Sequence, residues 1–200
     1  MNGEAQVPDS KLGTHSEEKR PMVSSQRYGR ASIALHWLTL ALLIGVYACI
    51  ELREMFPRGS DPREALKMWH FMLGLSVFLA VWIRLVARIL GTTPPIDPPA
   101  PKWQAVVALI VEFSLYALMI VLPILGWITL SAEGDVIPFF GLQLPALVAE
   151  NKQLAERTED LHKTLATAGY FLIGLHAAAA LFHHYVQHDN TLRRMLPSRN

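Results

Sequence analysis

The sequence predicts an all-α integral membrane protein, a bundle of four helices. Of its 200 residues, 52% are hydrophobic, and the mean hydropathy is positive. The apolar residues gather in four blocks, and the charged residues lie almost entirely between them. A run of about 20 apolar residues is long enough to cross a bilayer as a helix. We therefore expect membrane spans at residues of about 31–50, 68–90, 105–130 and 161–185.

The first two spans differ in polarity. The first carries ALHWLTLALLIGVYACI, which contains no charge. The second contains Arg84 and Arg88, so we expect its last turns to reach the headgroup boundary, where arginine extends its charged end into water. The connector that follows, TTPPIDPPAPK, is too rich in proline to be helical.

The third span contains Glu112 and Pro123, and we expect the proline to kink it. The sequence leaves open whether Glu112 faces the bundle or the headgroups. A long loop with an amphipathic piece is expected from Ser131 to about Asp160, before the fourth span. A short basic tail then ends the chain.

The polar residues 1–26 are expected to form a disordered N-terminal extension. They lack the apolar middle region of a secretory signal peptide, so the first span is expected to direct insertion and to stay in the membrane. One four-span domain is then expected over residues 27–197, with a tail at 198–200. The single cysteine, Cys49, excludes an intramolecular disulfide.

Four spans place both ends of the chain on one membrane face, called side one here; the opposite face is side two. The arginines of side one lie tightly against the span ends, which favours a cytoplasmic location for both termini. The first loop of side two carries Arg53, Arg58, Arg63 and Lys67. These cations could guide a small anion towards the bundle, or they could form an ordinary mixed-charge loop.

Four histidines in the spans fall at two matching depths. His162 and His176 are fourteen residues apart, nearly four helical turns, so they share a face and lie ~21 Å apart along the axis. His36 lies near the side-one end of the first span, and His70 near the side-two end of the second. His36 and His176 therefore share a lower level, and His70 and His162 share an upper level.

Two imidazoles at one depth are the arrangement that holds a haem iron on both axial faces. Such a haem has no open coordination site and is typical of electron carriers. A zinc site would need four ligands converging on one point, whereas these histidines are spread over two levels. The alternative for each single histidine is an interhelical hydrogen bond. The chain has no Cys-x-x-Cys-His, so any haem would be held non-covalently.

Three more residues are candidates for binding roles at side one. His183 follows His176 by seven residues, on the same face and about 10 Å nearer the surface. It could hydrogen-bond or protonate a quinone headgroup, or it could be an interfacial histidine at a helix C-terminus. Arg84 lies on the face of His70 at the depth of the lower level, where it suits a haem propionate or a quinone carbonyl; simple snorkelling is the alternative. Arg30 is a further propionate candidate.

The chain resembles the bacterial cytochrome b561 family, specifically its four-span members with two haem b groups. The resemblance covers roughly residues 27–197 and rests on SIALHWLTLALLIGVYACIELR, WHFMLGLSVFLAVWIRLVARI, TTPPIDPPAPK and LHKTLATAGYFLIGLHAAAALFHHYVQHDNTLRRMLP, with LHAAAALFHHY the most specific part. The family pattern implies haem ligands at His36, His70, His162 and His176. The nearest likeness is to the superoxide oxidase type of this family.

That likeness implies an oxidoreductase in the bacterial inner membrane, with no catalytic residues beyond the haems. It would pass electrons from superoxide at the periplasmic side to ubiquinone in the bilayer. One alternative is a cytochrome b subunit that relays electrons between a partner dehydrogenase or hydrogenase and the quinone pool. Another, from a different class, is a haem-free membrane transporter or scaffold. A redox partner protein fits the first alternative; no nucleic acid partner is expected.

Overall fold

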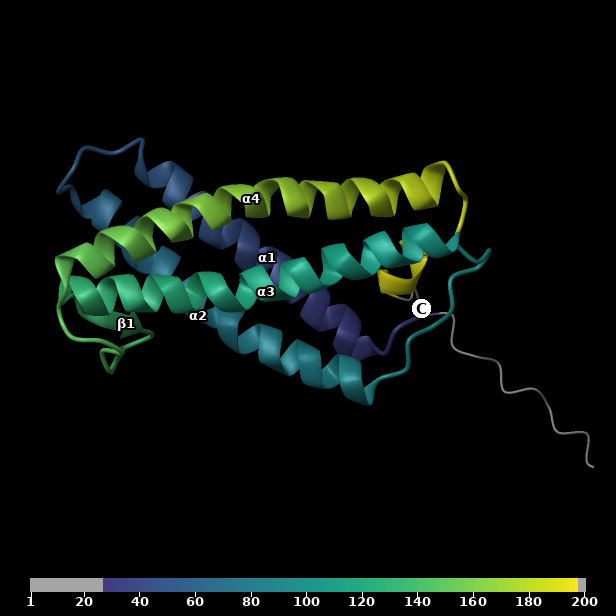
Figure 1. Ribbon diagram of the computed structural model, residues 1–200, viewed down its shortest axis with the longest axis horizontal. Helices are drawn as coiled ribbons and strands as arrows, with labels where there is room; N and C mark the ends of the chain where they lie inside the picture. Colours follow the sequence, from purple (N-terminus) through teal and green to yellow (C-terminus); the bar gives the residue numbers. More distant parts are fainter. Residues whose placement is uncertain (1–26, 198–200) are drawn as a thin grey trace, which may run out of the picture.

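The computed structural model describes residues 27–197 and forms a bundle of long helices (Figure 1). Four of them are long and apolar enough to cross a membrane, which confirms the predicted membrane four-helix bundle. They are α1 (Arg30–Arg53), α2 (Asp61–Leu90), α3 (Lys102–Glu133) and α4 (Lys152–Tyr185). The described chain begins and ends at the same end of the bundle, side one. The expectations for residues 1–26 and 198–200 lie outside the described residues.

The loop predicted from Ser131 to about Asp160 is shorter than expected, because α4 begins at Lys152. The side chain of Asn151 accepts the N–H of Leu154 at 3.0 Å and so caps the helix. The hydroxyl of Thr158 hydrogen-bonds that of Thr129 on α3 at 2.8 Å. The amphipathic piece is therefore the first part of α4, held against α3.

A small antiparallel hairpin, not predicted from the sequence, closes the bundle at side two. It pairs β1 (Ile137–Phe139) with β2 (Leu142–Leu144). The turn between the strands needs positive φ angles, 45° at Phe140 and 86° at Gly141, and glycine adopts such an angle without strain. Ile137 is buried against α2 and α3, which fixes the hairpin over the end of the bundle.

The helices pack in pairs, with α1 along α2 and α3 along α4. A buried cluster of Val77, Val81, Tyr116 and Met119 joins α2 to α3. The backbone of α4 makes few close approaches to α1 or α2, so α4 stands apart from both of these helices. Large apolar side chains cover the outside of the bundle, which suits helices surrounded by lipid.

One contact crosses that space, between Tyr47 on α1 and Gly169 on α4. The Tyr47 hydroxyl donates to the carbonyl of Ala166 at 2.9 Å. A Cβ at position 169 would lie 2.5 Å from that hydroxyl, so only glycine allows the approach. Gly169 is seven residues from both His162 and His176. The contact therefore lies between the two histidine levels.

The predicted basic tail is a folded structure at side one. Residues 186–197, called the C-terminal cap here, turn back across the bundle end and include the 3-10 helix η1 (Arg193–Met195). Arg194 is buried and donates to the carbonyl of Pro94 at 2.6 Å. The Trp37 indole on α1 donates to the carbonyl of Met195 at 2.8 Å. The cap thus joins the end of α4 to α1 and to the connector between α2 and α3.

We predict that Gly169→Ala destabilises the protein by about 1–3 kcal/mol, because the new methyl group overlaps the Tyr47 hydroxyl. Thermal unfolding of the detergent-solubilised protein, followed by circular dichroism, measures the effect. Gly29→Ala is the control, since a Cβ there meets nothing within 4 Å. Adding Tyr47→Phe to G169A should restore part of the loss. Unchanged unfolding of G169A would contradict the proposed close approach.

Candidate metal centres

The upper histidine pair consists of His70 on α2 and His162 on α4. Their ring centroids are 6.2 Å apart. Nδ1 of His70 donates to the carbonyl of Val46 at 2.9 Å. A carbonyl only accepts, so the neutral ring carries its hydrogen on Nδ1 and leaves Nε2 free as a metal ligand. A hydrogen bond from the ring nitrogen that does not bind the metal is the usual way in which metal-binding histidines are oriented.

A narrow apolar cavity borders the upper pair. A Cβ at Gly74 would meet nothing within 4 Å, and one at Gly126 would lie 3.6 Å from Cε1 of His162. The two glycines thus leave open space beside the imidazoles. The remaining lining residues are mostly apolar: Phe71, Leu75, Pro123, Trp127, Leu130 and Ile137. Such walls suit a flat, largely apolar ligand.

The lower pair consists of His36 on α1 and His176 on α4, with ring centroids 6.4 Å apart. Nη2 of Arg84 donates to Nδ1 of His36 at 2.9 Å. A guanidinium only donates, so the neutral His36 ring here carries its hydrogen on Nε2. If Nε2 binds a metal, the hydrogen moves to Nδ1, and Arg84 has to find another acceptor.

Both pairs fit an iron held between two imidazoles. A metal–nitrogen bond of about 2 Å on each side, added to the distance from nitrogen to ring centre, separates the two centroids by about 6 Å. The two observed separations match that value. Within residues 27–197, no three His, Cys, Asp or Glu side chains come together as a metal site. The structure therefore assembles two-histidine sites and not a tetrahedral one.

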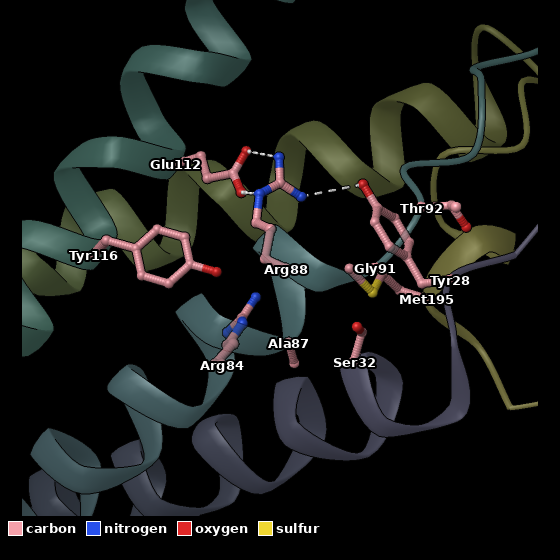
Figure 2. A pocket seen from close by; sticks show the side chains of 10 residues that line it. All are labelled: Tyr28, Ser32, Arg84, Ala87, Arg88, Gly91, Thr92, Glu112, Tyr116 and Met195. Atoms are coloured by element: carbon pink, nitrogen blue, oxygen red, sulfur yellow. Dashed lines mark hydrogen bonds and ion pairs between the residues drawn. The ribbon is translucent and has the colours of Figure 1, made fainter.

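A second cavity opens at side one between α1, α2 and α3 (Figure 2). Arg88 and Glu112 form a two-fold ion pair across it, with N–O distances of 3.0 and 3.1 Å. Glu112 therefore faces the bundle. Nη1 of Arg88 also donates to the Tyr28 hydroxyl at 3.4 Å. Arg84 points into the same cavity, 5.5 Å from the centre of the Tyr116 ring. In the described chain, no carboxylate lies within ion-pair distance of Arg84.

The other side-one candidates lie apart from this cavity. Nδ1 of His183 is 2.5 Å from Oδ2 of Asp189 in the C-terminal cap. His183 does not line the cavity, and no contact joins it to Arg84 over residues 27–197. Arg30 is exposed at the first turn of α1 and also lies outside the lining. The structure brings Arg84 to His36, but it does not bring Arg84, Arg30 and His183 together.

At side two, ion pairs already engage half of the predicted cations. Arg63 is buried and donates to two backbone carbonyls and a carboxylate of its own loop. Lys67 pairs with Asp135 at 3.4 Å. Arg58 is exposed, and Arg53 has only a loose pairing of 3.8 Å with a neighbouring glutamate. Of these four cations in the described chain, Arg53 and Arg58 are thus the ones left to act on an approaching anion.

Asp189 was not a candidate from sequence, and neither was the pairing of Arg88 with Glu112. Both depend on how distant segments meet in the fold. The only signal for Asp189 was its place six residues after His183, a spacing that on a continuous helix would not keep the two side chains together.

Comparison with known proteins places this architecture in a family. The sequence model of the prokaryotic cytochrome b561 family matches residues 27–198. Cytochrome b561 homolog 1 of Escherichia coli (strain K12) is 38% identical over 173 residues, which are 86% of this chain and 98% of that protein. A probable superoxide oxidase, CybB, of Yersinia pestis is 38% identical over 174 residues, which are 87% and 98% of the two chains. Cytochrome b561 homolog 2 of Escherichia coli (strain K12) is 28% identical over 172 residues, 86% and 92%. The chain therefore belongs to the prokaryotic cytochrome b561 family, multi-pass membrane proteins that transfer electrons with haem b as cofactor.

Proposed function

We propose that this protein oxidises superoxide and reduces ubiquinone in the bacterial inner membrane, with two haem b groups between its helices. The observation that carries the proposal is the stacking of two imidazole pairs, 6.2 and 6.4 Å between centroids, along one face of α4. The similarity to a probable superoxide oxidase of Yersinia pestis supports the choice of electron donor. The overall reaction converts two superoxide ions into dioxygen and supplies two electrons which, with two protons, convert ubiquinone into ubiquinol.

His70 and His162 would hold the upper haem, and His36 and His176 the lower one. Haem b ligated on both faces supplies reversible one-electron transfer without an open site on the iron. The protein's part is to hold the ligands in place. Helix α4 supplies one histidine to each level, and the Tyr47 contact at Gly169 joins α1 to α4 between the two levels.

We assign the carboxylates of the lower haem to Arg84. Its guanidinium contacts the lower ligand His36 and, within residues 27–197, pairs with no carboxylate, whereas Arg88 is already paired with Glu112. Because the metal-bound His36 ring carries its hydrogen on Nδ1, Arg84 then needs a new acceptor, and haem propionates supply one. Arg30, exposed at the start of α1, does not line this cavity, and we keep it as a further candidate for binding a haem propionate.

We place the quinone headgroup near His183 and the superoxide approach at side two. His183 extends the ligand face of α4 towards side one, where water can supply protons. Arg53 is close enough to act electrostatically on His70 and is exposed in part. This arrangement puts side two in the periplasm and both ends of the chain in the cytoplasm.

The function itself is tested by rapid mixing of the quinone-loaded protein with superoxide. We expect superoxide to disappear faster than by spontaneous dismutation, with one ubiquinol formed for two superoxide ions. A loss of superoxide no faster than in buffer would overturn the proposed donor and favour a relay from a partner dehydrogenase or hydrogenase.

Single ligand substitutions should each remove one haem. His36→Ala should leave the haem of the upper level, and His70→Ala that of the lower level, because the pairs are separate. Haem content per chain, measured by the pyridine haemochrome spectrum, should fall by about half in each variant when two ligands hold each iron. His188→Asn, at an exposed position in the cap where asparagine tolerates the positive φ, is the control. Unchanged haem content in H36A or H70A would refute the pairing.

Removing the Arg53 charge should slow the reaction with superoxide. We expect Arg53→Gln to lower the second-order rate constant roughly 2- to 10-fold at low ionic strength, and the difference to shrink in high salt. Arg157→Gln removes the same charge from an exposed position at the start of α4 and is the matched control. Equal effects of the two substitutions would show that only net charge matters.

A further inference from the structure

His183 is held by a buried carboxylate in the C-terminal cap. Oδ2 of Asp189 lies 2.5 Å from Nδ1 of His183, and the Asp189 side chain is 1% exposed. Oδ1 accepts the backbone N–H of Thr191 at 2.8 Å. The backbone N–H of Asp189 donates to the carbonyl of His183 at 3.1 Å. Asp189 is thus tied to His183 through both its side chain and its main chain.

Asp189 is present as a carboxylate at neutral pH. Burial alone would raise its pKa, but the hydrogen bonds from His183 and Thr191 outweigh that effect, and the pKa lies below its usual value. An ionised carboxylate only accepts hydrogen bonds, so Nδ1 of His183 must carry a hydrogen. The opposite nitrogen, Nε2, is then the one that can exchange a proton with a ligand.

The cap fixes Asp189 through its neighbour in the chain. The Asn190 side chain accepts the N–H of Asp97 at 3.0 Å and donates to the carbonyl of Pro95 at 3.3 Å. The backbone N–H of Asn190 donates to the carbonyl of Asp97 at 3.1 Å. His188, with a φ of 55°, turns the chain so that Asp189 faces back to α4. The connector between α2 and α3 therefore holds the carboxylate against the histidine.

We propose that Asp189 is a positioning residue for quinone reduction, which sets the tautomer of His183 so that Nε2 delivers a proton to the quinone. The proposal rests on the function proposed above. When ubiquinone has taken up an electron, its headgroup oxygen accepts the proton from Nε2 of the His183 imidazolium. The ring is left neutral with its hydrogen on Nδ1, bonded to Asp189, and Nε2 regains a proton from side-one water. An aspartate orients and supports a proton-transferring histidine in the same way in serine hydrolases.

The test compares an acceptor that needs protons with one that does not. Protein reduced with dithionite is mixed with a short-chain ubiquinone or with ferricyanide, and haem absorbance follows re-oxidation. We expect D189N and H183Q to slow oxidation by the quinone roughly 10- to 1000-fold and to leave oxidation by ferricyanide unchanged. The double variant should match H183Q, because Asp189 acts only through His183. D97N removes an exposed carboxylate at the same end and should behave as the parent protein.

A second readout follows the tautomer directly. Nitrogen-15 NMR of labelled histidine should place the His183 hydrogen on Nδ1 in the parent protein. In D189N the asparagine amide can also donate a hydrogen bond to Nδ1, so the distribution of the hydrogen between Nδ1 and Nε2 should change. Oxidation of D189N by quinone at the parental rate would overturn the proposal. Equal slowing with both acceptors would also overturn it, since that is the result of a purely structural role.

Two further outcomes separate this proposal from loss of haem in the variant and from failure of the proposed electron donor. If D189N loses haem, D189E keeps an acceptor-only group and should stay well above H183Q in its rate with quinone; a rate equal to that of H183Q would count against the proposal. Failure of superoxide to reduce the parent protein would defeat the proposed donor alone, because dithionite supplies the electrons here.

Discussion

The fourteen-residue spacing of His162 and His176 on α4 is the constraint on which the rest of the structure depends. One helix face carries a histidine for each level, so the distance between the two levels is set by helix geometry and does not depend on loops. The partner histidines then have to come from two different helices, His36 from α1 and His70 from α2. This explains why α4 packs its backbone against α3 and leaves side chains and open space towards α1 and α2.

Three other features hold the two histidine levels in place: the Tyr47 contact, the hairpin and the C-terminal cap. Tyr47 reaches across to the backbone beside Gly169, midway between the levels, and holds α1 against α4 there. The hairpin closes one end of the bundle and the C-terminal cap the other. Polar side chains are distributed unevenly between the two ends of the bundle. Buried Asp189 and Arg194 and half-buried Arg84, Arg88 and Glu112 lie at side one, whereas the cavity beside the upper pair has mostly apolar walls. Proton-dependent chemistry is therefore better placed at side one.

Much of this could be predicted from the sequence, because helix periodicity and span depth are local properties. They paired His36 with His176 and His70 with His162, and the structure brings both pairs together. Contacts made by non-local packing could not be predicted. Glu112 finds Arg88 on another helix, and Asp189 reaches His183 only because the chain reverses at His188 and is held by the α2–α3 connector. The hairpin could not be predicted either, because three-residue strands within a loop leave almost no periodic pattern in the sequence.

The central claim, that both levels hold a haem between two imidazoles, is tested most directly by electron paramagnetic resonance of the oxidised, purified protein. Two imidazole ligands make ferric haem low-spin and leave no open site. The account predicts two distinct low-spin ferric signals in equal amounts, together accounting for all the haem, and no high-spin signal. A major high-spin signal, or a single low-spin species with one haem per chain, would contradict it.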